Sequence, residues 1–258
     1  MELWASLDRV LTTVAEPGTL RSVTERFQQH QVRLALWTFV QEQFSAVQQI
    51  VNAGVQVAPI VPNLPAFVRD VTGGGPVKAM IGRFRALPSG TKFALPLRNA
   101  GNALKLAKQD FGMGLSILAE MELARCVPLG IRDAVISSAV IDLAVALNNR
   151  DVLVRLLALV ERRFGLSVVV ETANLGVSAG KLIEWGIDTQ RLTYLSPINR
   201  AGYGMRPSQA ACELVCRSGR VRVVAADIDC DGELRLDDAD PYVRALGVQG
   251  YLLPDSIR

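Results

Sequence analysis

Two glutamates that each end a short apolar run are the side chains best suited to move a proton. Glu120 closes the run SILAE, and Glu171 closes the run SVVVE. A carboxylate at the edge of an apolar core loses part of its hydration, which raises its pKa toward the working range of a general acid or base. We therefore expect Glu120 and Glu171 to be catalytic. The alternative for each is an ion pair with an arginine such as Arg98 or Arg125.

The glycine- and arginine-rich loop 199–208 is the clearest indication of a bound ligand. Its glycines let the backbone approach a ligand closely, and its arginines supply positive charge. Either Ser208 as the cap or Pro207 in the first turn would open the next helix, whose free N–H groups favour an anion. The alternative is a flexible loop with solvated arginines. With polar residues from other segments, the expected anion-binding residues are Arg98, Asn174, Asn199, Arg200, Gly202, Gly204, Arg206 and Ser208.

The acidic segment 227–238 resembles the calcium loop of EF-hand and dockerin modules. A glycine stands at position six of that loop, and the acidic residues at positions one, three, five and twelve are Asp227, Asp229, Asp231 and Asp238. The resemblance implies a Ca²⁺ ion held by carboxylate oxygens, although those modules usually carry a bidentate glutamate at position twelve. The alternative is a loop after a strand, in which Asp237 or Asp238 caps the final helix.

A second glycine cluster, 72–78 (TGGGPVK), interrupts the predicted helix 66–85. It lacks the Gly-Lys-Ser/Thr ending of a nucleotide-binding P-loop. We interpret it as a mobile loop that could act as a lid, with anion binding as the alternative.

Several kinds of chemistry are disfavoured by the residues that the predicted site lacks. The single histidine, His30, lies in the predicted N-terminal helical region, which argues against a histidine metal site or a Ser-His-Asp triad. The lysines fall in predicted helices or at strand starts, so Schiff-base chemistry is also disfavoured. The sequence has no NAD or flavin fingerprint, and Ca²⁺ is the cofactor that it suggests.

These side chains must be positioned by short strands that alternate with longer helices. Nine apolar runs are predicted strands: 32–39, 55–61, 93–97, 115–119, 134–140, 166–170, 192–195, 221–225 and 251–253. The predicted helices are 44–53, 66–85, 100–109, 144–163, 178–185, 208–217 and 237–246. This α/β alternation predicts a (β/α)₈ TIM-type barrel, with a doubly wound open parallel sheet as the alternative. A barrel needs eight strands, so one prediction is surplus, and the runs 32–39 and 93–97 are the candidates.

The last third of the chain resembles the closing strands of aldolase-like and uncharacterised (β/α)₈-barrel proteins. The resemblance is carried by the runs SPINRAGYGMRPSQAACELV and VRVVAADIDCDGELRLDDADPYVRALGVQGYLL. It contains no diagnostic catalytic motif. The resemblance therefore implies the barrel fold and assigns no activity.

Length and composition agree with one domain. The 258 residues match the usual size of such a barrel, and we assign 1–258 to a single barrel domain in which 1–30 is an N-terminal helical extension. The net charge of +3 and the lack of a basic, aromatic-rich run indicate no nucleic-acid partner. Because no secretory signal, membrane-length apolar run or disulfide spacing is seen, we expect a cytoplasmic protein without a membrane partner.

Two functions are consistent with these features. The first is a lyase or isomerase that acts on a small anionic metabolite, such as a phosphorylated one, through carboxylate acid–base chemistry. The second is a non-catalytic barrel that serves as a binding or assembly subunit, with calcium as a stabilising ion. In that case a homo-oligomer could form through the N-terminal extension and the aliphatic stretch Val152–Val160. An enzyme should have an open barrel mouth lined by carboxylates, whereas an assembly subunit should have that mouth filled or covered.

Overall fold

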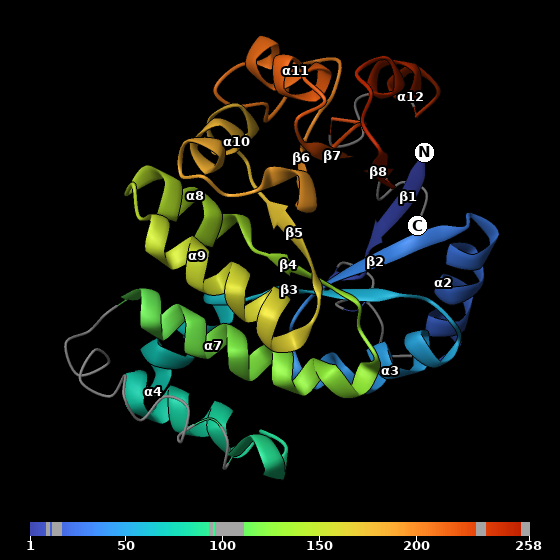
Figure 1. Cartoon of the computed structure of the whole chain (residues 1–258). Coiled ribbons are helices and arrows are strands. Elements are labelled where there is room, and N and C mark those ends of the chain that lie inside the picture. The colour runs from blue at the N-terminus through green and yellow to red at the C-terminus, as the bar shows by residue number, and fades with distance from the viewer. Residues whose placement is uncertain (9–10, 12–16, 93–94, 96–110, 231–235, 254–258) are drawn as a thin grey trace.

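Eight parallel strands close into a barrel in this computed structural model, which describes residues 1–8, 11, 17–92, 95, 111–230 and 236–253. The strands follow one another around the barrel in chain order, and β8 pairs with β1 to complete it (Figure 1). They are β1 Glu2–Ser6, β2 Val32–Thr38, β3 Val57–Val61, β4 Asp133–Ile136, β5 Ser167–Glu171, β6 Thr193–Pro197, β7 Arg222–Ala226 and β8 Gly250–Leu252. This confirms the predicted (β/α)₈ barrel over the open sheet.

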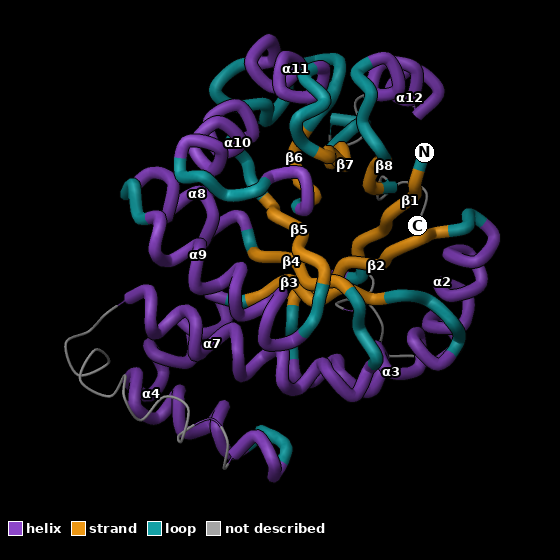
Figure 2. The backbone as a smooth tube through the Cα atoms, in the orientation of Figure 1, coloured by secondary structure: helices purple, strands orange, loops and turns teal. Residues whose placement is uncertain are grey.

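Helices surround the strands as an outer layer (Figure 2). In the described part of the chain they are α2 Pro17–Gln29, α3 Phe44–Asn52, α4 Leu64–Arg85, α7 Phe111–Cys126, α8 Ser138–Ala146, α9 Arg150–Ala158, α10 Leu175–Glu184, α11 Gln209–Arg217 and α12 Leu236–Ala245. Short helical turns are η1 Gln41–Gln43, η3 Val127–Leu129, η4 Leu159–Arg163 and η5 Thr189–Arg191. The helices predicted at 44–53, 178–185, 208–217 and 237–246 are confirmed to within a few residues.

Alternate residues of each strand face the barrel interior, and this alternation decides which side chains reach the mouth. In β5, Val169 belongs to the cluster inside the barrel, whereas Val168 and Val170 belong to the core between strands and helices. Glu171 has the same parity as Val169, so its side chain is directed inward at the C-terminal end of the strand. The interior cluster consists of Trp4, Leu34, Leu36, Ala58, Val135, Val169, Leu195 and Val224.

The N-terminal segment is part of the barrel and not a helical extension of it, so that prediction for residues 1–30 is wrong. Residues Glu2–Ser6 form β1, which pairs with β2 on one side and β8 on the other. The helical part of the prediction is confirmed by α2, which begins at Pro17. The strand was missed because ELWAS is short and opens on a charged residue, whereas the helical spacing that follows it is strong.

The predicted strand 115–119 is a helix. These residues lie in the middle of α7, which contacts β3 and α9 on its barrel side. On its other side, Met113, Ile117 and Met121 form a small separate core that includes Met80 and Phe84 of α4. A helix that is buried on both sides is apolar all round, so its sequence resembles a buried strand. The predicted strand 93–97, except for Leu95, and the predicted helix 100–109 lie outside the described residues. The run 32–39, the other candidate for the surplus strand, is confirmed as β2.

Helix α4 contains the glycine cluster that we interpreted as a mobile loop. The helix is broken at Gly75, whose backbone angles are φ 78° and ψ 161°, as the predicted glycine break required. Only glycine adopts this combination readily. The cluster is therefore a kink within a helix that packs on α7, and not a loop between elements.

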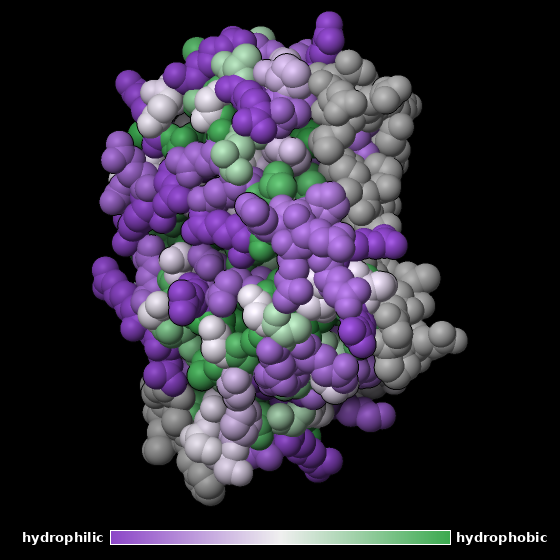
Figure 3. All heavy atoms as spheres, turned by 90° about the vertical axis from the view of Figure 1, so that its right-hand side faces the viewer, coloured by the Kyte–Doolittle hydropathy of each residue, from purple (hydrophilic) through white to green (hydrophobic). Residues whose placement is uncertain are grey.

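The aliphatic stretch proposed as an oligomer interface faces the protein's own core. The side chains of this stretch that are buried in the core are Val152, Leu153, Leu156, Leu157 and Val160. On the face shown in Figure 3, which carries α2 and α12, described apolar side chains are interspersed with polar ones. None of the helices in the described ranges is long and apolar enough to cross a membrane.

Candidate functional site

A cavity of about 300 Å³ lies at the C-terminal ends of the strands, inside the barrel mouth. Its floor is apolar and comes from strand residues that include Leu36, Ile60 and Leu195. Its described polar lining consists of three carboxylates and several hydroxyls: Ser6, Asp8, Ser138, Glu171, Thr172, Ser196 and Asp227. This is the end of the barrel where this fold carries its reactive groups, because the loops that follow the strands can vary without loss of the core.

Glu171 is the predicted catalytic residue that the structure places in the mouth. Its Oε2 accepts the backbone N–H of Ser138, the first residue of α8, at 2.8 Å. Burial raises the pKa of Glu171, and the charges of Asp8 and Asp142 raise it further, while the hydrogen bonds from Ser138 lower it. The net direction is upward, as expected for a carboxyl that exchanges protons with a ligand.

Asp8 is a mouth carboxylate that the sequence analysis missed. It follows β1, and its Oδ1 accepts the backbone N–H of Thr38 at 2.7 Å, while its Oδ2 accepts the Thr38 hydroxyl. These bonds fix Asp8 across the ends of two neighbouring strands. The signal that could have found it is a carboxylate shortly after the apolar triplet Leu3 to Ala5, as Glu171 and Asp227 stand at the ends of other apolar runs.

Asp142 holds the backbone that carries Glu171. It lies in α8, and its carboxylate accepts the Thr172 hydroxyl and the backbone N–H of Ala173, the latter at 3.0 Å. The Thr172 oxygen in turn accepts the N–H of Asn174 at 3.0 Å. The turn after β5 is thus tied to α8 at several atoms, which restricts the position of Glu171.

The loop 199–208 has an internal network instead of polar groups aimed at the mouth. The Asn199 side chain is fully buried, donating to the Tyr203 carbonyl at 2.7 Å and accepting the Tyr203 N–H at 2.8 Å. Ser208 caps α11 by accepting the N–H of Ala211 at 3.2 Å, which confirms the predicted cap. Arg200 and Arg206 are exposed, and neither lines the mouth cavity.

The glycines of that loop and Asn174 lie near the same rim. Gly202 and Gly204 have φ values of 71° and 67°, which glycine adopts without strain. A Cβ on Gly204 would lie 3.3 Å from Pro197, a residue of the mouth lining. Asn174 precedes α10, and its Oδ1 is buried without a hydrogen-bond partner in the structure. Arg98 lies outside the described residues.

Glu120 does not lie at a strand end, so its predicted position is wrong. It is in the middle of α7, nearly buried, with Oε1 at 3.4 Å from Nε of Arg163. This is the ion-pair alternative, although with a different arginine from those expected. The prediction failed because the apolar residues before Glu120 belong to a helix that is buried on two sides, and not to a strand.

The calcium-loop resemblance is only partly within the described residues. Asp227 lines the mouth directly after β7 with a φ of 50°, and Asp229 is buried. Asp231 and the side chain of Asp238 lie outside what the structure describes, although residue 238 falls in α12. Among the described residues, no group of three or more His, Cys, Asp or Glu side chains is placed to hold a metal ion.

No protein-family model matches the chain, and no curated protein matches it either. The fold and the geometry of its mouth are therefore the basis for a functional proposal.

Proposed function

We propose that this barrel is an enzyme that binds a small polar molecule in its mouth and moves a proton with Glu171. The observation that carries the proposal is the position of this carboxyl: it lines the mouth cavity, is largely desolvated and is held at one oxygen by a backbone N–H. A carboxyl with a raised pKa exchanges its proton closer to neutral pH, which suits general acid–base chemistry. Many lyase and isomerase reactions need this proton transfer and no redox cofactor.

The charge of the mouth bears on which part of a substrate enters it. Its described lining contains Asp8, Glu171 and Asp227 and neither lysine nor arginine. A carboxylate or phosphate beside these groups would be repelled, so the reacting part of the molecule should be neutral or cationic. The anionic substrate expected from the sequence is compatible with this only if its acidic group lies outside the cavity, for example toward Arg200 or Arg206.

A ligand screen tests whether the mouth binds such molecules. Thermal unfolding would be followed with small hydroxy-carbonyl compounds, amines and their phosphorylated forms, and a ligand at 100 times its dissociation constant should add about 2.7 kcal/mol. Ala226→Leu enlarges a side chain that lines the cavity and should abolish the shift. Ala210→Leu on the exposed side of α11 is the matched control and should keep it. Stabilisation that survives Ala226→Leu would contradict the mouth as the binding site.

The alternative of a non-catalytic binding or assembly subunit has less support. Its expected signature was a filled or covered mouth, whereas the described residues of the mouth line a cavity. Its expected aliphatic interface is buried within the chain. A mouth ligand that binds without any chemical change would favour this alternative.

A further inference from the structure

A second cavity, of about 600 Å³, lies outside the barrel mouth. It is bounded by residues 39–42, which follow β2, by the inner face of α4 and by the end of α7. It shares no lining residue with the mouth cavity. We propose that this cavity is a binding site for a small anion of the phosphate, sulfate or polycarboxylate type.

The charges of the lining favour an anion. Four cationic side chains face the cavity, against the two carboxylates of Glu42 and Asp70; the cationic residues are Arg69, Lys78, Arg83 and Arg125. Within the described residues, Arg69, Lys78 and Arg125 form no ion pair with a carboxylate. Cations that converge on one cavity without partners bind an anion more strongly than scattered surface charges do.

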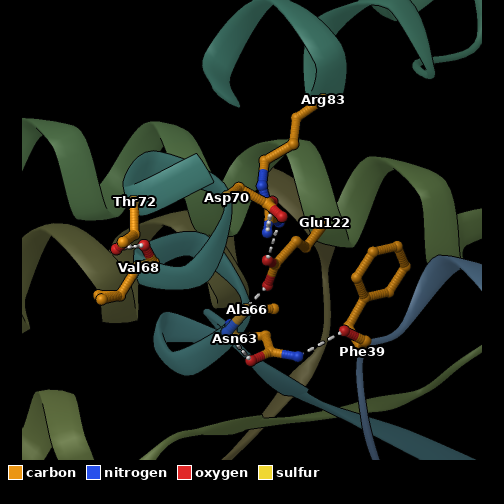
Figure 4. Close-up of polar contacts among 8 residues, drawn as sticks. All are labelled: Phe39, Asn63, Ala66, Val68, Asp70, Thr72, Arg83 and Glu122. Carbon is orange, nitrogen blue, oxygen red and sulfur yellow. Dashed lines mark hydrogen bonds and ion pairs between the residues drawn. The ribbon is translucent and has the colours of Figure 1, made fainter. Parts of the chain in front are cut away.

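Arg83 differs from the other three cationic residues of the cavity because it forms ion pairs with two carboxylates. Its Nη1 lies 2.9 Å from Oε1 of Glu122, and its Nη2 lies 2.8 Å from Oδ2 of Asp70 (Figure 4). Glu122 is held from behind by the backbone N–H of Asn63 at 2.9 Å, and Asn63 also donates to the Phe39 carbonyl. The network neutralises Arg83 and ties α4 and α7 to the ends of β2 and β3. Arg69, Lys78 and Arg125 therefore supply the excess positive charge.

Arg125 is held in place without an ion pair to a carboxylate. Its guanidinium lies 5.2 Å from the centroid of the Phe39 ring, a cation–π contact that orients the group. The side chain is half-buried, and this burial lowers the pKa of Arg125. The charges of Glu122 and Glu42 raise this pKa again, but neither carboxylate forms an ion pair with Arg125. A partly desolvated cation that lacks such a pair is unfavourable, and a bound anion would reduce that penalty.

The kinked helix α4 leaves space for the anion. Three of its glycines line the cavity: Gly73, Gly74 and Gly82. A Cβ on Gly74 would lie 2.7 Å from Cδ of Lys78, so glycine lets the lysine stem cross the helix at this point. A Cβ on Gly82 would meet nothing within 4 Å, so a side chain there would enter open space. The cluster 72–78 thus contributes to the proposed anion site as part of helix α4. Anion binding was the alternative to a mobile loop for this cluster.

Calorimetric titration of the whole chain with sodium sulfate, at constant ionic strength, tests the proposal. Sulfate is the probe because it keeps its charge across neutral pH. Lys78→Gln and Arg125→Gln should each weaken sulfate binding about tenfold, the loss expected for one charge-assisted contact. Arg162→Gln, an exposed arginine outside the cavity, should leave it unchanged. Absence of sulfate binding, or equal weakening by all three substitutions, would overturn the proposal.

A second variant tests the site without removing a charge. Gly82→Met should fill the cavity and abolish sulfate binding, whereas Gly180→Met, at an exposed position of α10 that is also free of neighbours, should not. Both replace glycine within a helix, so both should preserve or increase helix stability. Ala226→Leu, which fills the mouth, should bind sulfate as the unaltered protein does, because the two cavities share no lining residue. Loss of sulfate binding in Ala226→Leu would place the anion in the mouth and contradict the inference.

Discussion

The carboxylate of Glu171, at the end of β5, accepts the backbone N–H of Ser138, at the start of α8, over 2.8 Å. Ser138 begins a helix whose preceding residue, Ser137, makes no side-chain cap, so Glu171 fills the role of the missing cap. This bond by itself favours the ionised carboxylate. The pKa of Glu171 is nevertheless raised, because burial outweighs the hydrogen bonds from Ser138. The bond therefore fixes the direction of the carboxyl without removing its tendency to take up a proton.

The charge of Asp8 contributes to that raised pKa, and Asp8→Asn should lower it. Asp8 is a carboxylate near Glu171, and removing its negative charge makes ionisation of Glu171 easier. A carbon-detected NMR titration of the glutamate carboxyls measures the change directly. Asp151→Asn, at an exposed position of α9, is the control and should leave the pKa of Glu171 unchanged. A Glu171 pKa that rises or stays constant in Asp8→Asn would show that the two groups are not coupled.

Glu122 should make the free energy of unfolding depend on pH. Burial raises its pKa from 4.5 to about 7, even though Arg83 and the Asn63 N–H favour the charged form. The folded state thus holds this proton more tightly than the unfolded state does. The resulting stability is fully present below pH 4.5 and is lost as the pH rises through about 7, with a total of ~3 kcal/mol. Urea unfolding at several pH values should show this slope in the native sequence.

Glu122→Gln should flatten that slope, because glutamine does not titrate. The variant keeps an oxygen for the Asn63 N–H but loses the ion pair with Arg83, so it should also be less stable at low salt. Glu184→Gln, an exposed carboxylate of α10, is the matched control and should keep the slope. An unchanged slope in Glu122→Gln would mean that another group is responsible.

Asp142 should matter for stability as well as for positioning Glu171. Asp142→Ala leaves the Thr172 hydroxyl and the Ala173 N–H without their acceptor, at a cost of about 1–3 kcal/mol in the free energy of unfolding. Asp142→Asn retains one acceptor oxygen and should cost less. Denaturant unfolding of the two variants gives the comparison. Equal stability of both variants and the native protein would show that these bonds contribute nothing.

The side chains of α9 should behave as core and not as an interface. Leu156 is almost completely buried in the single chain, so Leu156→Ala should lower the free energy of unfolding by about 2–5 kcal/mol. Leu214→Ala, in a side chain that is 71% exposed, should change it little. Light scattering of Leu156→Ala should give the same molar mass as the native protein. A change in molar mass without a loss of stability would revive the assembly interpretation.

The barrel could be predicted from the sequence because short aliphatic runs and amphipathic stretches alternate over most of the chain. Glu120 and Glu171 show where this reasoning fails. Both end an apolar run. The run before Glu171 is a strand whose alternate residues face the barrel interior, whereas the run before Glu120 is part of a helix that packs between the barrel and α4. A fully buried helix has no polar face, so its sequence lacks the 3.6-residue alternation of apolar and polar residues that would identify it as a helix.

The site could be predicted only in part, for two further reasons. Asp8 was missed because its strand is brief and precedes a long helical pattern. Asn199 was predicted as a ligand group, yet its amide is used to close its own loop, a distinction that depends on tertiary geometry. The cationic cavity beside α4 brings together residues from three distant segments and has no local sequence signature.

Proton exchange at carbon, measured in D₂O, tests the central claim most directly. Each ligand that stabilises the mouth would be incubated with the native protein or with Glu171→Gln, and the loss of its C–H signals would be followed by NMR. We predict exchange at one carbon with the native protein and a rate at least about 100-fold lower with Glu171→Gln, while circular dichroism shows both proteins folded. Equal exchange rates for the two proteins, or no exchange with any mouth ligand, would contradict the role of Glu171 as the group that moves the proton.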